Sequence, residues 1–188
     1  MVLDLIRKTA RLEGEDCEPD PAEWFRQKYD KEPDYSKLLD EIAKTQTERQ
    51  QLLRGYFEPN EEERTEGLKL PGVAHKAIAR LVAAGYLRVI VTTNFDRLIE
   101  KALDDLGVAP TIISTVDQVE GALPLAHSGA TVIKLHGDYL DTRIRNTETE
   151  LAAYDSALDK LLDRVFDEYG LIRLRLVCGM GYSAPRSD

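Results

Sequence analysis

Residues 87–96 read Leu-Arg-Val-Ile-Val-Thr-Thr-Asn-Phe-Asp, and this stretch decides the fold class. Its first six residues are rich in β-branched side chains and too few for a helix, so they predict a short buried strand over 87–92. The polar residues after Val91 predict where that strand ends. A helical apolar stripe stopped by Gly107 follows, made of Phe95, Leu98, Ile99, Ala102, Leu103 and Leu106.

The alternation of helix and strand continues on both sides of this stretch. Upstream, a helix ended by Gly85 is predicted from the apolar face Val73, Ala77, Ile78, Leu81 and Val82. Downstream, residues 111–113, 131–135 and 172–178 predict further strands. Residues 147–150 resemble a capping box that opens a long helix with Leu151, Tyr154, Leu158, Leu161, Leu162, Val165 and Phe166 on one side. Such alternation predicts parallel crossovers and an open α/β sheet with flanking helices.

Residues 1–70 have a different character, since they contain no convincing strand pattern. Apolar residues recur there at helical intervals, and proline and acidic clusters interrupt them. Pro21 after Asp20 is typical of a capped helix start. The acidic stretch 58–64 is most simply a solvated loop or helix end. We therefore expect a helical region over 1–70, followed by an α/β part over 71–188, within a single domain.

Composition narrows the function classes. The 188 residues are 43% hydrophobic and 31% charged, which is ordinary for a globular protein, and the net charge is −9. That charge argues against general binding of nucleic-acid backbones or anionic membranes. It leaves room for an anionic small molecule held by backbone N–H groups.

Cysteine usage and the start of the chain indicate a compartment. Cys17 and Cys178 are too few for a disulfide framework or a four-ligand zinc site. No apolar run approaches the ~18 residues that a membrane helix needs, and the first residues are unlike a signal peptide. His75 and His127 have no partners at metal-ligand spacing, so no metal is assigned. We expect a reducing, cytoplasmic location.

Candidate functional residues follow three of the predicted strands. These segments are Thr92-Thr93-Asn94-Phe95-Asp96, His136-Gly137-Asp138 and Gly179-Met180-Gly181-Tyr182-Ser183. In an open parallel sheet, ligands bind at the carboxyl ends of the strands. A His, an Asn and an Asp beside a glycine-rich turn supply a base, an orienting amide, an acceptor and room for a phosphate.

Each segment also has a purely structural interpretation. Asn94 has the residue type of a helix N-cap, with Asp96 in the first helical turn where the dipole favours it. Taken alone, His136 is typical of a hydrogen-bonded core residue, and Gly179 and Gly181 are typical of loops. It is the concurrence of the three segments that favours a site.

The three segments resemble those of bacterial sirtuin-like (SIR2-like) NAD-processing domains. Residues 92–100 resemble their "TTN(Y/F)D–LIE" segment, residues 134–138 their "KLHG" segment, and residues 181–183 their "GYS" or "GTS" segment, in family order over roughly 70–185. The resemblance implies a Rossmann-like sheet that binds NAD as a substrate and cleaves its nicotinamide–ribose bond. NAD would then be the partner molecule.

The resemblance also implies roles for individual residues. Asn94 would hold the nicotinamide ribose or the attacking water, Asp96 would accept a hydrogen bond from the nicotinamide carboxamide, and His136 would act as general base. Gly181 and Ser183 would contact the phosphate and adenosine side. The residues implied to bind NAD are Thr92, Thr93, Asp96, Gly137, Gly179, Gly181 and Ser183.

The sequence departs from the family in ways that rank the alternatives. Deacylating sirtuins carry a zinc module of four cysteines and usually have Gln where this chain has Thr93. Both differences favour NAD hydrolysis over deacylation, and the resemblance implies a role in a bacterial defence protein. The family's opening strand and "GAGxS" loop have no counterpart here, so we expect truncation at both ends and little activity from these 188 residues alone. A non-catalytic module whose helical half forms homo-oligomers is the second reading, and a deacylase is the third.

Overall fold

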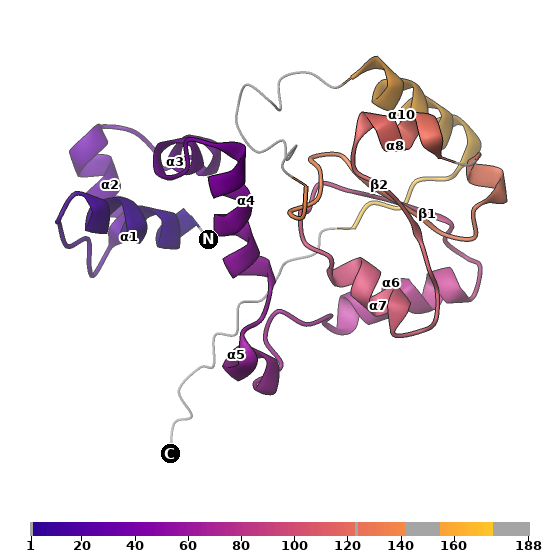
Figure 1. Cartoon of the computed structure of the whole chain (residues 1–188), viewed down its shortest axis with the longest axis horizontal. Helices are drawn as coiled ribbons and strands as arrows, with labels where there is room; N and C mark the ends of the chain where they lie inside the picture. Colours follow the sequence, from indigo (N-terminus) through magenta and orange to yellow (C-terminus); the bar gives the residue numbers. More distant parts are fainter. Residues whose placement is uncertain (1, 123, 142–154, 175–188) are drawn as a thin grey trace. The chain divides into compact units, whose positions relative to one another are not determined.

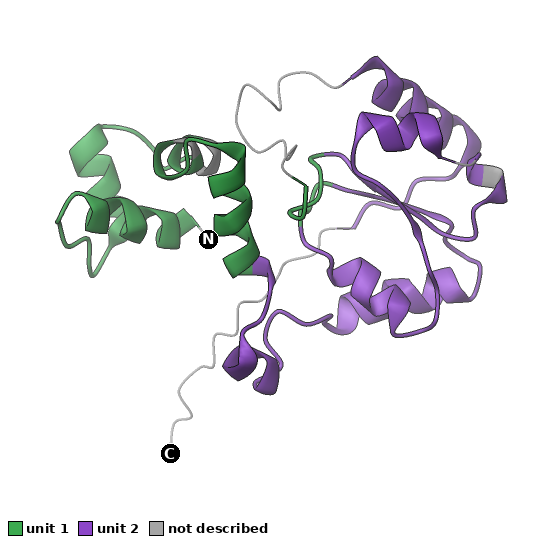
Figure 2. Cartoon of the chain, viewed as in Figure 1, with its two compact units in different colours: residues 1–56, 93–95, 136–154 green, residues 57–92, 96–135, 155–188 purple. Residues whose placement is uncertain are grey.

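The computed structural model describes residues 2–122, 124–141 and 155–174. These residues form two compact units, drawn in different colours in Figure 2. Unit 1 comprises residues 1–56, 93–95 and 136–154, and unit 2 comprises residues 57–92, 96–135 and 155–188. Unit 1 therefore combines the helical first part of the chain with two short segments that follow strands in the sequence.

The first part of the chain is helical, as the sequence predicts. Its helices are α1 (Val2–Leu12), α2 (Pro21–Tyr29), α3 (Tyr35–Ile42), α4 (Gln46–Phe57) and α5 (Glu61–Thr65). The core of unit 1 is built from Leu5, Ile6 and Leu38, against which Trp24, Phe25 and Tyr56 pack among others. Helices α1 to α4 thus share one apolar centre.

The helix starts in this part are fixed by local capping. The Asp20 side chain accepts from the Glu23 N–H, and Pro21 occupies the first helical position of α2, which confirms the start predicted from sequence. Asn60 and Glu63 form a reciprocal capping box at α5. The acidic stretch around residue 60 therefore includes a short exposed helix.

Unit 2 contains a parallel sheet of β1 (Val89–Thr92), β2 (Thr111–Ile113) and β3 (Thr131–Lys134) in the order β1-β3-β2. Val89 pairs with Thr131, and Thr92 pairs with Lys134. All four residues of the central strand β3 are buried. The open parallel α/β architecture expected from the sequence is confirmed for the described residues.

Helices lie on both faces of this sheet (Figure 1). Helices α6 (Val73–Ala83) and α7 (Leu98–Asp104) lie on one side, and α8 (Val116–Gly121) and α10 (Ser156–Glu168) lie on the other. The 3₁₀ turn η1 (Leu125–His127) precedes β3. Helices on both faces bury the sheet from both sides, which accounts for the burial of every residue of its central strand β3.

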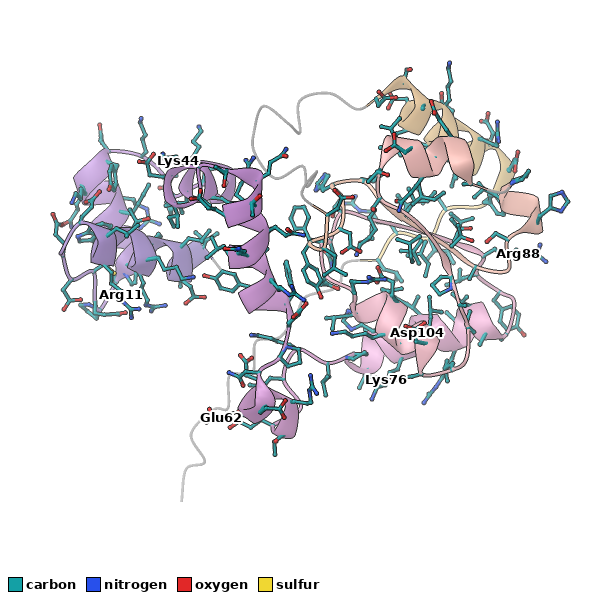
Figure 3. The ribbon with its side chains drawn as sticks, viewed as in Figure 1. Arg11, Lys44, Glu62, Lys76, Arg88 and Asp104 are labelled. Carbon is teal, nitrogen blue, oxygen red and sulfur yellow. The ribbon has the colours of Figure 1, made fainter. Side chains whose placement is uncertain are left out.

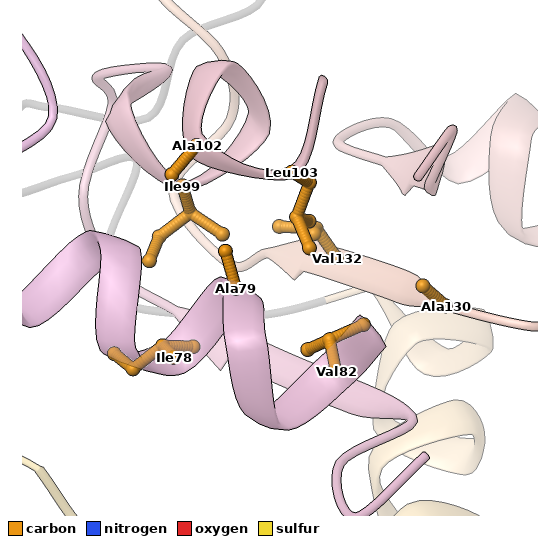
Figure 4. Close-up of a cluster of buried hydrophobic side chains, with 8 residues drawn as sticks. All are labelled: Ile78, Ala79, Val82, Ile99, Ala102, Leu103, Ala130 and Val132. Atoms are coloured by element: carbon orange, nitrogen blue, oxygen red, sulfur yellow. The ribbon is translucent and has the colours of Figure 1, made fainter. Parts of the chain in front are cut away.

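The main core of unit 2 lies between α6, α7 and the sheet (Figure 4). Ala79, Leu103 and Val132 have no exposed surface. Burying a side chain the size of Leu or Val contributes roughly 1.5–3 kcal/mol. This cluster therefore packs α6 and α7 against the central strand β3.

The face that α6 buries differs from the predicted one. His75, Ile78, Ala79 and Val82 are buried, whereas Val73, Ala77 and Leu81 are exposed. The His75 Nδ1 accepts the Gly72 N–H at 3.2 Å and turns this side chain inward at the helix start. Gly85, with φ of +78°, ends the helix as predicted.

Three other predicted boundaries are wrong. Helix α7 begins at Leu98 rather than near Phe95, and Leu106 lies beyond its end. Helix α10 begins at Ser156 with Asp155 as its N-cap, because the Asp155 side chain accepts the Ala157 N–H. The predicted capping box at 147–150 lies outside the described residues, as do Leu151 and Tyr154.

The predicted last strand is only partly covered by the structure. Residues 171–174 form no strand, and residues 175–178 lie outside the described part of the chain. Within the described ranges, no helix is both long and apolar enough to cross a membrane.

Candidate active site

Strands β1 and β3 end side by side and in register in unit 2. Thr92, the last residue of β1, pairs with Lys134, the last residue of β3. The Leu135 N–H donates to the Thr92 carbonyl at 2.9 Å and extends this ladder by one residue. The chain therefore leaves both strands at the carboxyl edge of the sheet, where ligands bind in this fold class.

After β1, the structure changes the interpretation of Asn94. The N-cap position of α7 is occupied by Arg97, and the helix begins only at Leu98. Asn94 is half-buried and Thr93 is exposed. The capping role that the residue type of Asn94 suggested is therefore wrong.

Asp96 takes over the start of α7. Its Oδ1 accepts the Leu98 N–H at 3.0 Å, which satisfies one of the helix N–H groups that have no partner within the helix. Asp96 therefore lies before α7, not in its first turn as the structural interpretation had it.

A buried ion pair lies beneath this turn in unit 2. The Lys134 Nζ donates to the Glu100 Oε1 at 2.9 Å and to the Asp96 backbone carbonyl at 2.6 Å. The Lys134 side chain has no exposed surface, and that of Glu100 is 5% exposed. The carboxylate of Glu100 also lies in the first turn of α7, where the helix dipole stabilises negative charge.

After β3, His136 lies in a turn within unit 1. The side chain is half-buried, and its ring centroid lies 6.0 Å from that of Phe95. The Tyr139 N–H donates to the Phe95 carbonyl at 3.3 Å. Two segments that follow different strands in the sequence, 93–95 and 136–139, thus meet in unit 1, and they carry Asn94 and His136.

The turn after His136 is tightly held. Gly137 is buried with φ of +91°, a conformation that favours glycine. Asp138 is 5% exposed, and its Oδ1 accepts the Leu140 N–H at 3.0 Å. The Gln50 side chain of α4 donates to the Leu140 carbonyl. The turn that follows His136 is therefore held by Asp138 within the turn and by Gln50 from α4.

The third predicted segment is not described. Gly179, Gly181 and Ser183 lie outside the described residues, so their expected contacts with NAD stay predictions. Of the other predicted NAD-binding residues, Thr92 and Asp96 lie in unit 2, while Thr93 and Gly137 lie in unit 1.

The histidines and cysteine that were set aside lie elsewhere. His75 is buried in α6, His127 is exposed in η1, and Cys17 is a buried free thiol. Among the residues that the structure describes, no three His, Cys, Asp or Glu side chains are grouped as a metal site would require.

Sequence reasoning missed the buried ion pair of Lys134 and Glu100. Glu100 lies next to Ile99 of the apolar stripe, and Lys134 follows the apolar residues Val132 and Ile133. The available signal was an acidic residue in the apolar pattern of α7 and a basic residue in that of β3. Buried charges occur mainly in pairs, so two such residues of opposite sign are candidates for one ion pair.

Comparison with known proteins assigns these segments to one family. The model of a family described as SIR2-like domain matches residues 88–184, a little over half of the chain. The match includes both strand-end segments and the undescribed residues 179–183. No curated protein matches the chain.

Proposed function

The chain belongs to the SIR2-like domain family, whose members bind NAD, and we propose that this domain hydrolyses NAD to nicotinamide and ADP-ribose. The observation that carries the proposal is the register of β1 and β3, which end together at Thr92 and Lys134. The segments with Asn94 and His136 start from these two ends. Family membership supports an NAD-related function, and the strand-end chemistry supports hydrolysis.

The reaction needs positioning more than strong acid catalysis. Nicotinamide leaves as a neutral molecule while cationic character develops on the ribose, so orientation and electrostatics lower the barrier. His136 takes the proton of the attacking water or of a ribose hydroxyl, since an imidazole titrates near neutral pH. Asn94 orients the ribose or that water.

Asp96 binds the nicotinamide end of the substrate. Its Oδ1 accepts the Leu98 N–H, and its Oδ2 has no hydrogen-bond partner among the residues that the structure describes. That second oxygen accepts an N–H of the nicotinamide carboxamide. Thr92, Thr93 and Gly137 line the NAD site, and Gly179, Gly181 and Ser183 contact the phosphates and the adenosine.

The test is to incubate the protein with NAD and to quantify nicotinamide and ADP-ribose. His136→Ala is expected to lower the rate by about 10²–10⁴-fold, the usual cost of a lost general base. His127→Ala, which changes an exposed histidine in η1, is the matched control and should retain the parental rate.

The outcomes separate the three functions considered. Equal release of nicotinamide and ADP-ribose that depends on His136 supports hydrolysis. NAD binding without turnover would identify a binding module. Nicotinamide release only in the presence of an acylated peptide would identify a deacylase. Parental turnover in folded His136→Ala would remove His136 from the mechanism.

A further inference from the structure

The Lys134–Glu100 pair is an unusual feature of the core of unit 2. Both side chains are nearly or wholly removed from water, and their charged atoms lie 2.9 Å apart. Removing two charges from water is costly, and the attraction between them often does no more than offset that cost. A hydrophobic pair would pack there without this cost, so the pair calls for an explanation other than stability.

The contacts of the lysine indicate what the pair does. Besides Glu100, the Lys134 ammonium donates to the Asp96 carbonyl at 2.6 Å. The Asp96 side chain in turn accepts the Leu98 N–H. The backbone of Asp96 is therefore held from strand β3, and its side chain is held from helix α7.

Glu100 keeps the lysine in this position. An ammonium without a counter-charge in the core would draw water in or shift its geometry. The Glu100 carboxylate, three residues after Arg97 at the helix start, fixes the ammonium where it reaches the Asp96 carbonyl. The position of Asp96 thus depends on both members of the pair.

We propose that Lys134 and Glu100 are positioning residues for NAD binding: their ion pair holds the turn at Asp96 so that the free carboxylate oxygen meets the nicotinamide carboxamide. The inference rests on the proposed function. It adds that substrate affinity depends on two buried residues that do not themselves touch the substrate.

The experiment uses the whole chain and the double variant Lys134→Met/Glu100→Leu, which removes both charges of the buried pair together. Arg97, whose Nε lies 4.0 Å from Glu100, is 34% exposed and stays in contact with water. The matched control is Lys44→Met/Glu41→Leu, which removes an exposed pair of the same residue types, 3.4 Å apart; Lys44 is labelled in Figure 3. Amide hydrogen exchange without NAD and the kinetics with NAD are measured on both.

Without NAD, the Leu98 amide should exchange at least about 10-fold faster in the double variant, because the Asp96 turn loosens locally. The Leu135 amide, bonded to the Thr92 carbonyl, should stay within about 3-fold of the parental rate. With NAD, KM should rise about 10- to 100-fold, the range for losing a hydrogen bond to a charged group, while kcat changes less. The control should match the parental protein throughout.

Removing the pair in a second protein, the Asp96→Asn variant, separates a positioning role from a general effect on the fold. In Asp96→Asn, removal of the pair should raise KM by less than about 3-fold further, because both changes act on one contact. If the effects of the pair and of Asp96→Asn simply multiply, the pair does not act through Asp96 and the inference is overturned.

The remaining outcomes are also decisive. An unchanged Leu98 exchange rate overturns the inference, and so does a loosened turn with parental KM. If the double variant does not fold, Glu100→Gln replaces it, because that variant removes the counter-charge of Lys134 but keeps an acceptor for it. Parental Leu98 exchange and parental KM in Glu100→Gln would overturn the inference. A parental protein that binds no NAD would overturn the proposed function, while Leu98 exchange would still show whether the pair positions Asp96.

Discussion

Two lysines of this molecule each contact a carboxylate at short distance, in regions of opposite character. Lys134 in unit 2 has no exposed side-chain surface and meets Glu100. Lys28 in unit 1, at the end of α2, donates to Glu13 and to Glu15, and its side chain is 28% exposed. Lys28 also lies 5.1 Å from the Trp24 ring.

The difference teaches that one kind of ion pair serves two purposes according to burial. Water and salt screen the Lys28 cluster, so breaking it has little effect. Nothing screens Lys134, and loss of either partner leaves a charge in the core. We therefore expect the buried pair to affect fold and substrate binding strongly, and the exposed cluster to affect local pKa values.

The largest expected effect is that of Lys134→Ala. It leaves the buried Glu100 carboxylate with only the half-buried Arg97 guanidinium as a charged partner, 4.0 Å away, which should lower the free energy of unfolding by about 3–5 kcal/mol. Urea unfolding measures the change. The same substitution at the exposed position, Lys28→Ala, should leave the unfolding midpoint almost unchanged, and equal losses at the two sites would show that burial does not distinguish them.

Asn94→Ala is the next largest, and its effect falls on turnover. Because α7 begins at Leu98, the substitution removes no helix cap, and stability should fall by less than the ~0.5–2 kcal/mol that a lost cap costs. Turnover at saturating NAD should fall roughly 10²-fold through misplaced ribose or water. Kinetics and thermal melts on one sample measure both.

The control for Asn94 is Gln27→Ala, which removes an exposed amide that bonds Glu23 in α2. It should alter neither turnover nor the melting temperature noticeably. A large fall in melting temperature with parental turnover in Asn94→Ala would instead assign Asn94 a structural role.

Local sequence patterns sufficed for β1, β2 and β3 and for the segments that follow β1 and β3. They were wrong for residues 172–174, which form no strand. Residues 89–92 and 131–134 are short and rich in β-branched side chains, so strand and strand end were both predictable. Parallel pairing then placed Thr92 and Lys134 at one edge of the sheet. Segments 92–96 and 136–138, which resemble those of the family, continue the chain from that edge of the sheet.

The sequence could not show which face of α6 is buried, where α7 begins or which residue pairs with Glu100. Helix α6 carries two overlapping apolar stripes, and its packing against α7 and the sheet decides which of them is buried. The start of α7 depends on the Asp96 side chain rather than on the Asn94 residue type. The partner of Glu100 lies 34 residues away on another element, beyond any local pattern.

A smaller effect concerns the alkaline titration of Tyr29 in the exposed cluster. Burial and the hydrogen bond that its hydroxyl donates to Glu13 raise the pKa of Tyr29 from 10.0 to about 12. The folded state thus favours the neutral phenol, and this contribution to stability is complete below pH 10.0 and is lost as the pH rises to about 12.

Phenolate absorbance of the parental protein minus that of Tyr29→Phe should therefore rise near pH 12. In Glu13→Gln the same transition should move toward the ordinary value, because the carboxylate no longer opposes ionisation. A Tyr29 transition at the ordinary value in the parental protein would show that the α1–α2 cluster does not hold in solution.

The smallest effect is expected from Lys28→Met, which keeps an apolar stem beside Trp24 and removes only the charge. Hydrogen bonds from Lys28 are the main cause of the lowered pKa values of Glu13 and Glu15. A carboxyl whose pKa is lowered by folding stabilises the folded state above its ordinary pKa of 4.5, and this stabilisation is lost as the pH falls below it. The melting temperature of Lys28→Met should thus lie slightly below the parental one at neutral pH and low salt. The difference should vanish both in high salt and well below pH 4.5, since screening or protonation removes the attraction. A difference that persists in high salt, or that equals the effect of Lys134→Ala, would mean that the exposed cluster is not screened by solvent and would end the distinction between the two lysines.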